Sequence, residues 1–212
     1  MSDMFQPGSP FIRFLTRVCD CVILNLLLVL MTITVVFSGV GLVSVYAVTL
    51  KMVRLEEGGT VKNYFRSIRN NFIASVPATI ILMVDVFILA VLYYALRTDT
   101  LVLTPGLFVL LFIIAILLTA FLSYLLPLIA RFDNSFGGQC RNAVRLGLAN
   151  LPVTVMMTII NMAPFLTTAF APGMAGYISA FWITIGVAAG AYLDSYYLRI
   201  IFDKFTITGR TE

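Results

Sequence analysis

Six apolar segments run through this chain, and they constrain its fold more than any other feature. They are Val18–Phe37, Leu42–Val53, Phe72–Leu96, Thr104–Ala130, Leu148–Phe170 and Gly176–Ile201. An α-helix needs about 20 mainly apolar residues to cross the hydrocarbon core of a bilayer, which is roughly 30 Å thick. All but the second segment reach that length. Because 60% of the residues are hydrophobic and only 11% are charged, lipid must be the main solvent of this chain.

The sequence therefore predicts an all-α polytopic membrane protein, with a single domain over residues 1–212 built as a bundle of six hydrophobic helices. The second segment is short for a full crossing, and Ser38–Gly41 before it is typical of a turn. Two interpretations fit this segment. It is either half of a tight helical hairpin, which gives six crossings, or a re-entrant half-helix, which leaves five.

The positions of the basic residues favour six crossings. Lys and Arg in short loops accumulate on the cytoplasmic side of membrane proteins. With six crossings and both termini in the cytoplasm, 13 of the 14 basic residues lie on one face, and only Arg97 lies on the other. With five crossings and an external N-terminus, Arg13 and Arg17 would join Arg97 outside. We therefore expect a multi-pass protein with both termini cytoplasmic.

The first cytoplasmic loop has the pattern of a short amphipathic helix over Thr60–Asn71, lying along the membrane surface. Apolar side chains recur there at helical spacing, at Val61, Phe65, Ile68 and Phe72, while Lys62, Arg66 and Arg69 occupy another face. Such a helix either binds anionic lipid headgroups or docks a cytoplasmic partner. The candidate contact residues of this loop and of the second cytoplasmic loop are Glu57, Gly58, Lys62, Phe65, Arg66, Ile68, Arg69, Arg131, Asp133 and Asn134.

Asp85 is an acidic residue in the interior of the third apolar segment. A carboxylate at that depth is costly unless it is paired, protonated or reached by water, so we expect it to face the bundle interior. It either belongs to a proton or substrate pathway or is a protonated carboxyl that bonds a neighbouring helix. Asn25 and Asn161 are its candidate polar neighbours.

The last apolar segment carries Gly186, Gly190 and Asp194 at intervals of four residues, which places them on one stripe of a helix. Glycines at this spacing let helix backbones approach closely, so the stripe is expected to pack against another helix. Asp194 and Asp203 are expected towards the basic cytoplasmic face, where ion pairing is easier.

Enzymatic activity is not expected. The chain has no histidine, which is the commonest general base and metal ligand. Its three cysteines lack CxxC spacing, and the sequence contains no phosphate loop and no cluster of metal ligands. We therefore expect no catalytic residue, cofactor or metal site. The basic loops are also too small, and too poor in interleaved aromatic residues, to form a nucleic-acid surface.

Several local sequences resemble the YesL family of bacterial membrane proteins, and the similarity extends over nearly the whole chain. They are Ser9-Pro10-Phe11, Asp20, Leu50-Lys51, Arg54, Glu57-Gly58, Phe65, Asn71-Phe72 and, above all, Leu125 to Asn134. The resemblance implies a bacterial plasma-membrane protein. The family has no established biochemical activity, and its members are often encoded beside binding-protein-dependent carbohydrate transporters and glycoside-degrading enzymes.

The leading hypothesis is a non-enzymatic accessory component of an ABC-type carbohydrate uptake system, with the lipid bilayer and permease or ATPase subunits as partners. Permeases of such systems bind their ATPase through a cytoplasmic loop that has a glycine and two hydrophobic residues at fixed spacing. Gly58, Phe65 and Ile68 keep this spacing, although the alanines and the closing Leu-Pro of that loop are missing. The alternatives are an independent small transporter or channel that uses Asp85, and a membrane organiser that binds anionic lipid.

Overall fold

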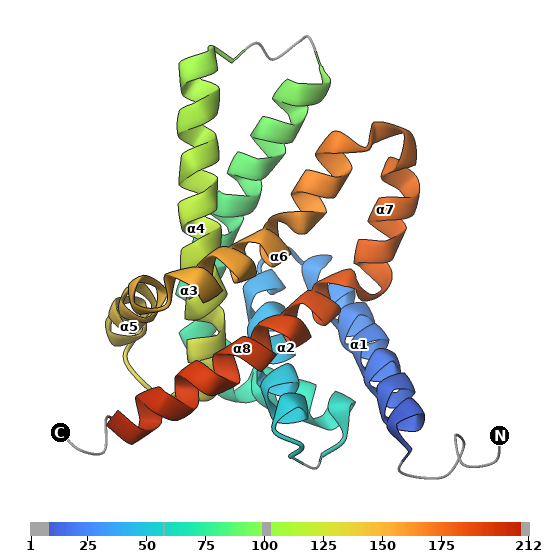
Figure 1. The fold of residues 1–212 in the computed structure, drawn as a ribbon, viewed down its shortest axis with the longest axis vertical. Helices are drawn as coiled ribbons and strands as arrows, with labels where there is room; N and C mark the ends of the chain where they lie inside the picture. Colours follow the sequence, from blue (N-terminus) through green and yellow to red (C-terminus); the bar gives the residue numbers. More distant parts are fainter. Residues whose placement is uncertain (1–8, 57, 99–102, 209–212) are drawn as a thin grey trace.

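A computed structural model describes residues 9–56, 58–98 and 103–208 (Figure 1). These residues form helices and turns and no strands. Five helical runs are long and apolar enough to cross a membrane: α1 (Pro10–Thr32), α3 (Thr60–Arg97), α4 (Pro105–Arg131), α6 (Leu151–Phe170) and the run of α7 (Ala175–Phe181), η3 (Trp182–Gly186) and α8 (Val187–Thr208). Two shorter helices, α2 (Ser38–Val53) and α5 (Phe136–Ala149), complete the bundle, and a single 3₁₀ turn, η2 (Pro172–Met174), precedes α7. The predicted all-α polytopic fold is confirmed.

The short second segment forms the central helix of the bundle. α2 packs against α1, α3, α4 and α8, and most of its residues are buried. Its 16 residues span only about 24 Å at 1.5 Å per residue, which is less than the membrane core. Surrounding protein nevertheless shields it from lipid on nearly every side. Burial by other helices therefore accounts for a segment that hydropathy alone left ambiguous.

The prediction of a turn at Ser38–Gly41 is wrong, because these residues form the first turn of α2. The chain instead reverses direction just before them, over residues 33–37. Gly39 and Gly41 serve helix packing. A Cβ atom on Gly39 would overlap Thr79 of α3, and one on Gly41 would lie 3.0 Å from the Cβ of Met31. Here glycine permits close helix approach, which a single sequence does not distinguish from turn formation.

Both ends of the described chain and the turn between α2 and α3 lie at the same end of the bundle, at the bottom of Figure 1. We call this the basic end. Polar contacts connect the helices at this end. The end of α2 is bonded to α8, because Arg54 forms an ion pair with Asp203 and Arg199 donates to the Val53 carbonyl at 3.0 Å. Thr60 donates to Asp20 of α1 at 2.7 Å, and Arg131 of α4 lies 3.9 Å from Glu56. The start of α1 and the C-terminal ends of α2, α4 and α8 are thereby gathered on one side.

Arg97 lies at the opposite end, where its guanidinium donates to the carbonyls of Thr168 and Ala169 at 2.9 and 3.0 Å. These carbonyls belong to the last turn of α6, which has no helical N–H donors for them. The isolated cation on this side therefore serves as a helix cap. Its separation from the other described basic residues matches the charge asymmetry that the sequence indicated.

The predicted short amphipathic helix over Thr60–Asn71 is not a separate element. It forms the first third of α3, which continues without a break for 38 residues, or about 57 Å. Pro77 lies inside this helix, and the neighbouring hydroxyls of Ser75 and Thr79 donate to carbonyls one turn earlier, at 2.7 and 2.9 Å. Hydroxyls and packed neighbours make proline tolerable within membrane helices. The helix therefore passes from the basic end into the bundle as one unit.

The arrangement of the two ends predicts the outcome of cysteine labelling. In a variant with Cys19, Cys21 and Cys140 replaced by serine, single cysteines are introduced at Gly59, Gly137 and Gly173, where a Cβ has open space or only ordinary contact. An impermeant maleimide should label the Gly173→Cys variant in intact cells and the other two only after lysis. Labelling of the Gly59→Cys variant in intact cells would contradict a cytoplasmic basic end.

Candidate functional site: a polar network inside the bundle

Asp85 is held inside the bundle by α3 and is only 4% exposed. Its Oδ2 accepts a hydrogen bond from the hydroxyl of Thr119 on α4, at 2.9 Å. Its Oδ1 is buried and has no hydrogen-bond partner among the described residues. The carboxyl group therefore joins two helices and retains one oxygen that could accept a proton or a cation.

Asp194 on α8 is completely buried. Its Oδ2 accepts hydrogen bonds from the Tyr46 hydroxyl of α2 at 2.9 Å and from the Asn161 amide of α6 at 2.7 Å. Both Asp194 and Asp203 were expected towards the basic face, where ion pairing is easier; the partners of Asp194 are neutral side chains, whereas Asp203 forms an ion pair with Arg54. The two acidic residues are nine positions apart, or about 13 Å along a helix. Asp194 therefore lies well away from the ion pair of Asp203, among neutral side chains.

A chain of hydrogen bonds connects the two buried carboxyl groups. The Asn161 amide also donates to the Ser123 hydroxyl of α4 at 3.1 Å, and Ser123 donates to the backbone carbonyl of Thr119 at 2.8 Å. Thr119 in turn donates to Asp85. We call this connected set the polar network, and its members are Tyr46, Asp85, Thr119, Ser123, Asn161 and Asp194. It joins α2, α3, α4, α6 and α8 within the membrane-spanning part of the bundle.

Asn25 is not a neighbour of Asp85, contrary to the sequence-based expectation. Its amide donates to the carbonyls of Trp182 and Ile183 at 2.9 and 2.6 Å, and its Oδ1 accepts from the Ala188 N–H at 2.8 Å. Residues Trp182–Gly186 form a π-helical turn, where the regular ladder of helical hydrogen bonds is interrupted. Asn25 therefore satisfies backbone groups that this interruption frees, and it ties α1 to α8.

The predicted stripe of Gly186, Gly190 and Asp194 is buried, and its members have different partners. A Cβ on Gly190 would lie 3.2 Å from Ile160 of α6, which is close helix packing. A Cβ on Gly186 would instead overlap the indole of Trp182 in the same helical run. Only part of the glycine pattern therefore reflects contact between helices.

The polar network brings together neutral donors and two acidic residues. No basic side chain is hydrogen-bonded or ion-paired to Asp85 or Asp194 in the described ranges. An ionised carboxylate in this setting costs several kcal/mol. The Oδ1 atoms of Asp85 and Asp194 are both buried without a hydrogen-bond partner among the described residues. Uptake of a proton, or of a small cation, by each of these oxygens would remove that cost. The described residues contain no cluster of three or more His, Cys, Asp or Glu residues suited to holding a metal ion.

The loop between α2 and α3, together with the start of α3, presents most of its predicted contact residues to solvent or lipid. Lys62, Arg66 and Arg69 are exposed, and Phe65 is 50% exposed. Ile68 is instead partly buried and packs against the core. Gly58 adopts φ +156°, and a Cβ there would collide with Asn63, so this turn requires glycine. Glu57 lies outside the described residues.

The second loop contributes the Arg131-Phe-Asp-Asn element between α4 and α5. Phe132 packs edge-on against Phe202 of α8, with ring centroids 5.3 Å apart, and Arg131 approaches Glu56 in the first loop. Asp133 and Asn134 are exposed, and the Asn134 side chain accepts from the Ser135 N–H at 2.8 Å as α5 begins. This element therefore fixes the turn and links the two loops.

Sequence reasoning missed Tyr46, Thr119 and Ser123. Hydroxyl side chains are common in apolar helices and often bond their own backbone, so each one alone carries little information. The spacing of Thr119 and Ser123, four residues apart on one face of α4, was the available signal. Their partners come from other helices and could not be identified without the fold.

Comparison with known proteins gives one match. A family model described as "Protein of unknown function, DUF624" matches residues 21–93, about a third of the chain, covering the second half of α1, all of α2 and nearly all of α3. The matched region includes Tyr46, Asp85 and the loop between α2 and α3, but not Asn161 or Asp194. No curated protein and no solved structure matches the chain.

The polar network predicts energetic coupling between Tyr46 and Asp194. Tyr46→Phe should destabilise the protein in detergent, and in the Asp194→Leu background the same change should cost less, because the hydroxyl no longer has its acceptor. Hydrogen bonds between membrane helices average about 0.6 kcal/mol and reach about 1.7, so we expect a coupling in that range from the unfolding free energies. Tyr124→Phe is the matched control, since the Tyr124 hydroxyl bonds Thr154 instead. Additive effects of Tyr46→Phe and Asp194→Leu would contradict the network.

Proposed function

We propose that this chain is a non-enzymatic, multi-pass protein of the bacterial plasma membrane that works as an accessory subunit of a binding-protein-dependent carbohydrate uptake system. In this proposal the basic end faces the cytoplasm and binds a permease or ATPase subunit. The YesL-like sequence elements support the link to carbohydrate uptake. The observation that carries the proposal is the exposed face at the start of α3.

That face is presented by a helix whose opposite side is fixed in the bundle. Tyr64 is fully buried and Ser67 is 7% exposed, whereas the intervening Phe65 and the preceding Val61 are 50% and 45% exposed. Thr60, the first residue of α3, bonds Asp20 of α1. An exposed aromatic side chain on a rigid support is well suited to bind a pocket of a partner, because little side-chain freedom remains to be lost.

Basic side chains flank this aromatic anchor, and further basic side chains lie on α5, which follows the second loop. Lys62 and Arg66 flank Phe65 on α3, and Arg141 and Arg145 are exposed on α5, where Leu148 is 68% exposed. The contact between Arg131 and Glu56 braces the two loops against each other. A partner with acidic and apolar surface would complement both loops together.

The proposal predicts that Phe65 is more important for association than the charges around it. Phe65→Ala should weaken co-purification of permease or ATPase subunits in mild detergent by about thirtyfold, since loss of one interface anchor costs about 2 kcal/mol or more. Replacement of Lys62, Arg66 and Arg69 by glutamine should have a smaller, salt-dependent effect. Growth on the relevant glycan provides the second readout.

Phe87→Ala is the matched control, because Phe87 is a similarly exposed phenylalanine further along α3, at 68% exposure. It should leave association unchanged. If Phe65→Ala preserves both partners and growth, the docking proposal fails. In that case the face is best regarded as an interfacial lipid anchor.

The polar network favours a second candidate function, in which the chain moves protons across the membrane as an independent small transporter. The two buried carboxyl groups, Asp85 on α3 and Asp194 on α8, would provide the proton-accepting positions, and Thr119, Ser123 and Asn161 connect them. Membrane transporters commonly use such intramembrane acidic residues in proton relays.

This candidate predicts proton flux in proteoliposomes that carry a pH-sensitive dye and valinomycin. The wild-type protein should acidify the lumen faster than empty liposomes do, and Asp85→Asn should abolish the difference. Asp133→Asn, which changes an exposed acidic residue, should have no effect. Equal flux with and without the wild-type protein would rule out this candidate.

A further inference from the structure

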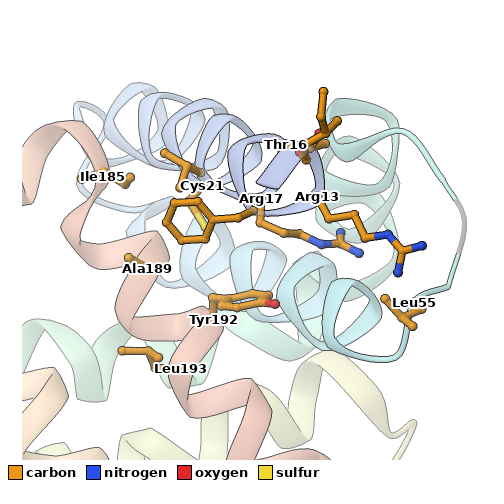
Figure 2. A pocket seen from close by; sticks show the side chains of 12 residues that line it. Arg13, Thr16, Arg17, Cys21, Leu55, Ile185, Ala189, Tyr192 and Leu193 are labelled. Atoms are coloured by element: carbon orange, nitrogen blue, oxygen red, sulfur yellow. The ribbon is translucent and has the colours of Figure 1, made fainter. Parts of the chain in front are cut away.

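A cavity of about 680 Å³ opens between α1 and α8 at the basic end. Figure 2 shows Arg13 and Arg17 of α1 extending in the same direction, towards Leu55, with the ring of Tyr192 from α8 below them. The two arginines are one helical turn apart and therefore lie on one face of α1. The volume falls in the range of about 300–1,000 Å³ that is typical of sites for small molecules. We call this cavity the α1–α8 groove.

The remainder of the α1–α8 groove is apolar. Phe14 and Val18 of α1 line it on one side, and Ile185 and Leu193 line it on the other. Phe14 is 67% exposed and Leu193 is 52% exposed, so these walls are open to the surroundings of the bundle. Ala189 has too small a side chain to fill the space between them. The groove thus continues from a cationic end into a membrane-spanning, apolar part.

The net positive charge at the cationic end of the groove is equal in size and opposite in sign to the charge of one phosphodiester group. Arg17 lies 4.0 Å from Asp20, and Asp20 also accepts a hydrogen bond from Thr60. Arg13 is exposed, and its side chain forms no ion pair or hydrogen bond within the described part of the chain. The two arginines and Asp20 therefore leave one net positive charge. A singly charged anion is complementary to it.

We propose that the α1–α8 groove binds one anionic phospholipid, with its phosphate between Arg13 and Arg17 and an acyl chain against Phe14, Val18 and Leu193. Guanidinium groups match the geometry of phosphate oxygens, and both arginines lie near the start of α1, at the basic end. A soluble anion would not use the apolar walls. A zwitterionic lipid would use the walls but would not need the uncompensated positive charge.

Lipid binding to the full-length protein in detergent, measured by native mass spectrometry, tests this proposal. The probes are phosphatidylglycerol and phosphatidylcholine with identical acyl chains. The wild-type protein should retain one phosphatidylglycerol in preference to phosphatidylcholine. Arg13→Gln together with Arg17→Gln should lower the affinity for phosphatidylglycerol roughly thirtyfold, the effect of two cationic contacts with an anionic lipid, and should abolish the preference.

Two further variants separate a defined site from general attraction. Arg141→Gln together with Arg145→Gln removes the same charge from exposed positions on α5, outside the groove, and should leave the preference intact. Ala189→Leu should fill the groove and weaken binding of both lipids while preserving the arginines. Thermal stability of each variant without added lipid identifies any loss of binding that is caused by misfolding.

Three results would overturn the proposal. The first is an equal loss of phosphatidylglycerol binding in both double arginine variants, which would indicate attraction without a site. The second is displacement of the lipid by millimolar glycerol 3-phosphate with unchanged binding in Ala189→Leu, which would indicate a soluble anion. The third is lipid binding that occurs only after deletion of residues 2–8, which would make the N-terminal segment the occupant.

Discussion

Lipid offers no hydrogen-bond partners, so the buried polar groups of this bundle must be satisfied by one another. This constraint accounts for the two sets of contacts that hold the central helices together. The polar network joins five helices through Asp85, Asn161 and Asp194, and Asn25 forms two hydrogen bonds with the π-helical turn of the last membrane run and one with the start of α8. Apolar packing brings the helices together, whereas these directional bonds fix their relative rotation, because side chains on facing helices must meet.

The short helix α2 depends most on this arrangement. It is too short to span the membrane core comfortably, and it is enclosed by α1, α3, α4 and α8. Gly39 and Gly41 permit the close approach of its neighbours, and Tyr46 and Thr49 bond Asp194 and Ser195 of α8. This enclosure explains how an apolar segment that is too short for a full membrane crossing occupies the centre of the molecule.

The polar network is buried, whereas the two candidate binding surfaces at the basic end are exposed. The polar network is buried and linked to the packing of the bundle, so its members affect stability whatever else they do. The exposed face of α3 around Phe65 and the α1–α8 groove lie at the basic end, where positive charge meets apolar surface. A protein partner would be recognised by the first and an anionic lipid by the second, because only the groove extends along membrane-spanning helices.

The sequence by itself determined the helical membrane fold, since long apolar segments of about 20 residues have no other stable form in a bilayer. It also separated Arg97 from the other basic residues and indicated that Asp85 is buried. Tertiary structure decided which polar residues meet. Asn25 was grouped with Asp85 and instead bonds α8, Asp194 was expected where ion pairing is easier and instead bonds the neutral side chains of the polar network, and Ser38–Gly41 was interpreted as a turn and instead begins α2. The reason is that hydropathy and periodicity report the surroundings of a single helix, whereas these contacts depend on the rotation and depth of helices that are distant in the sequence.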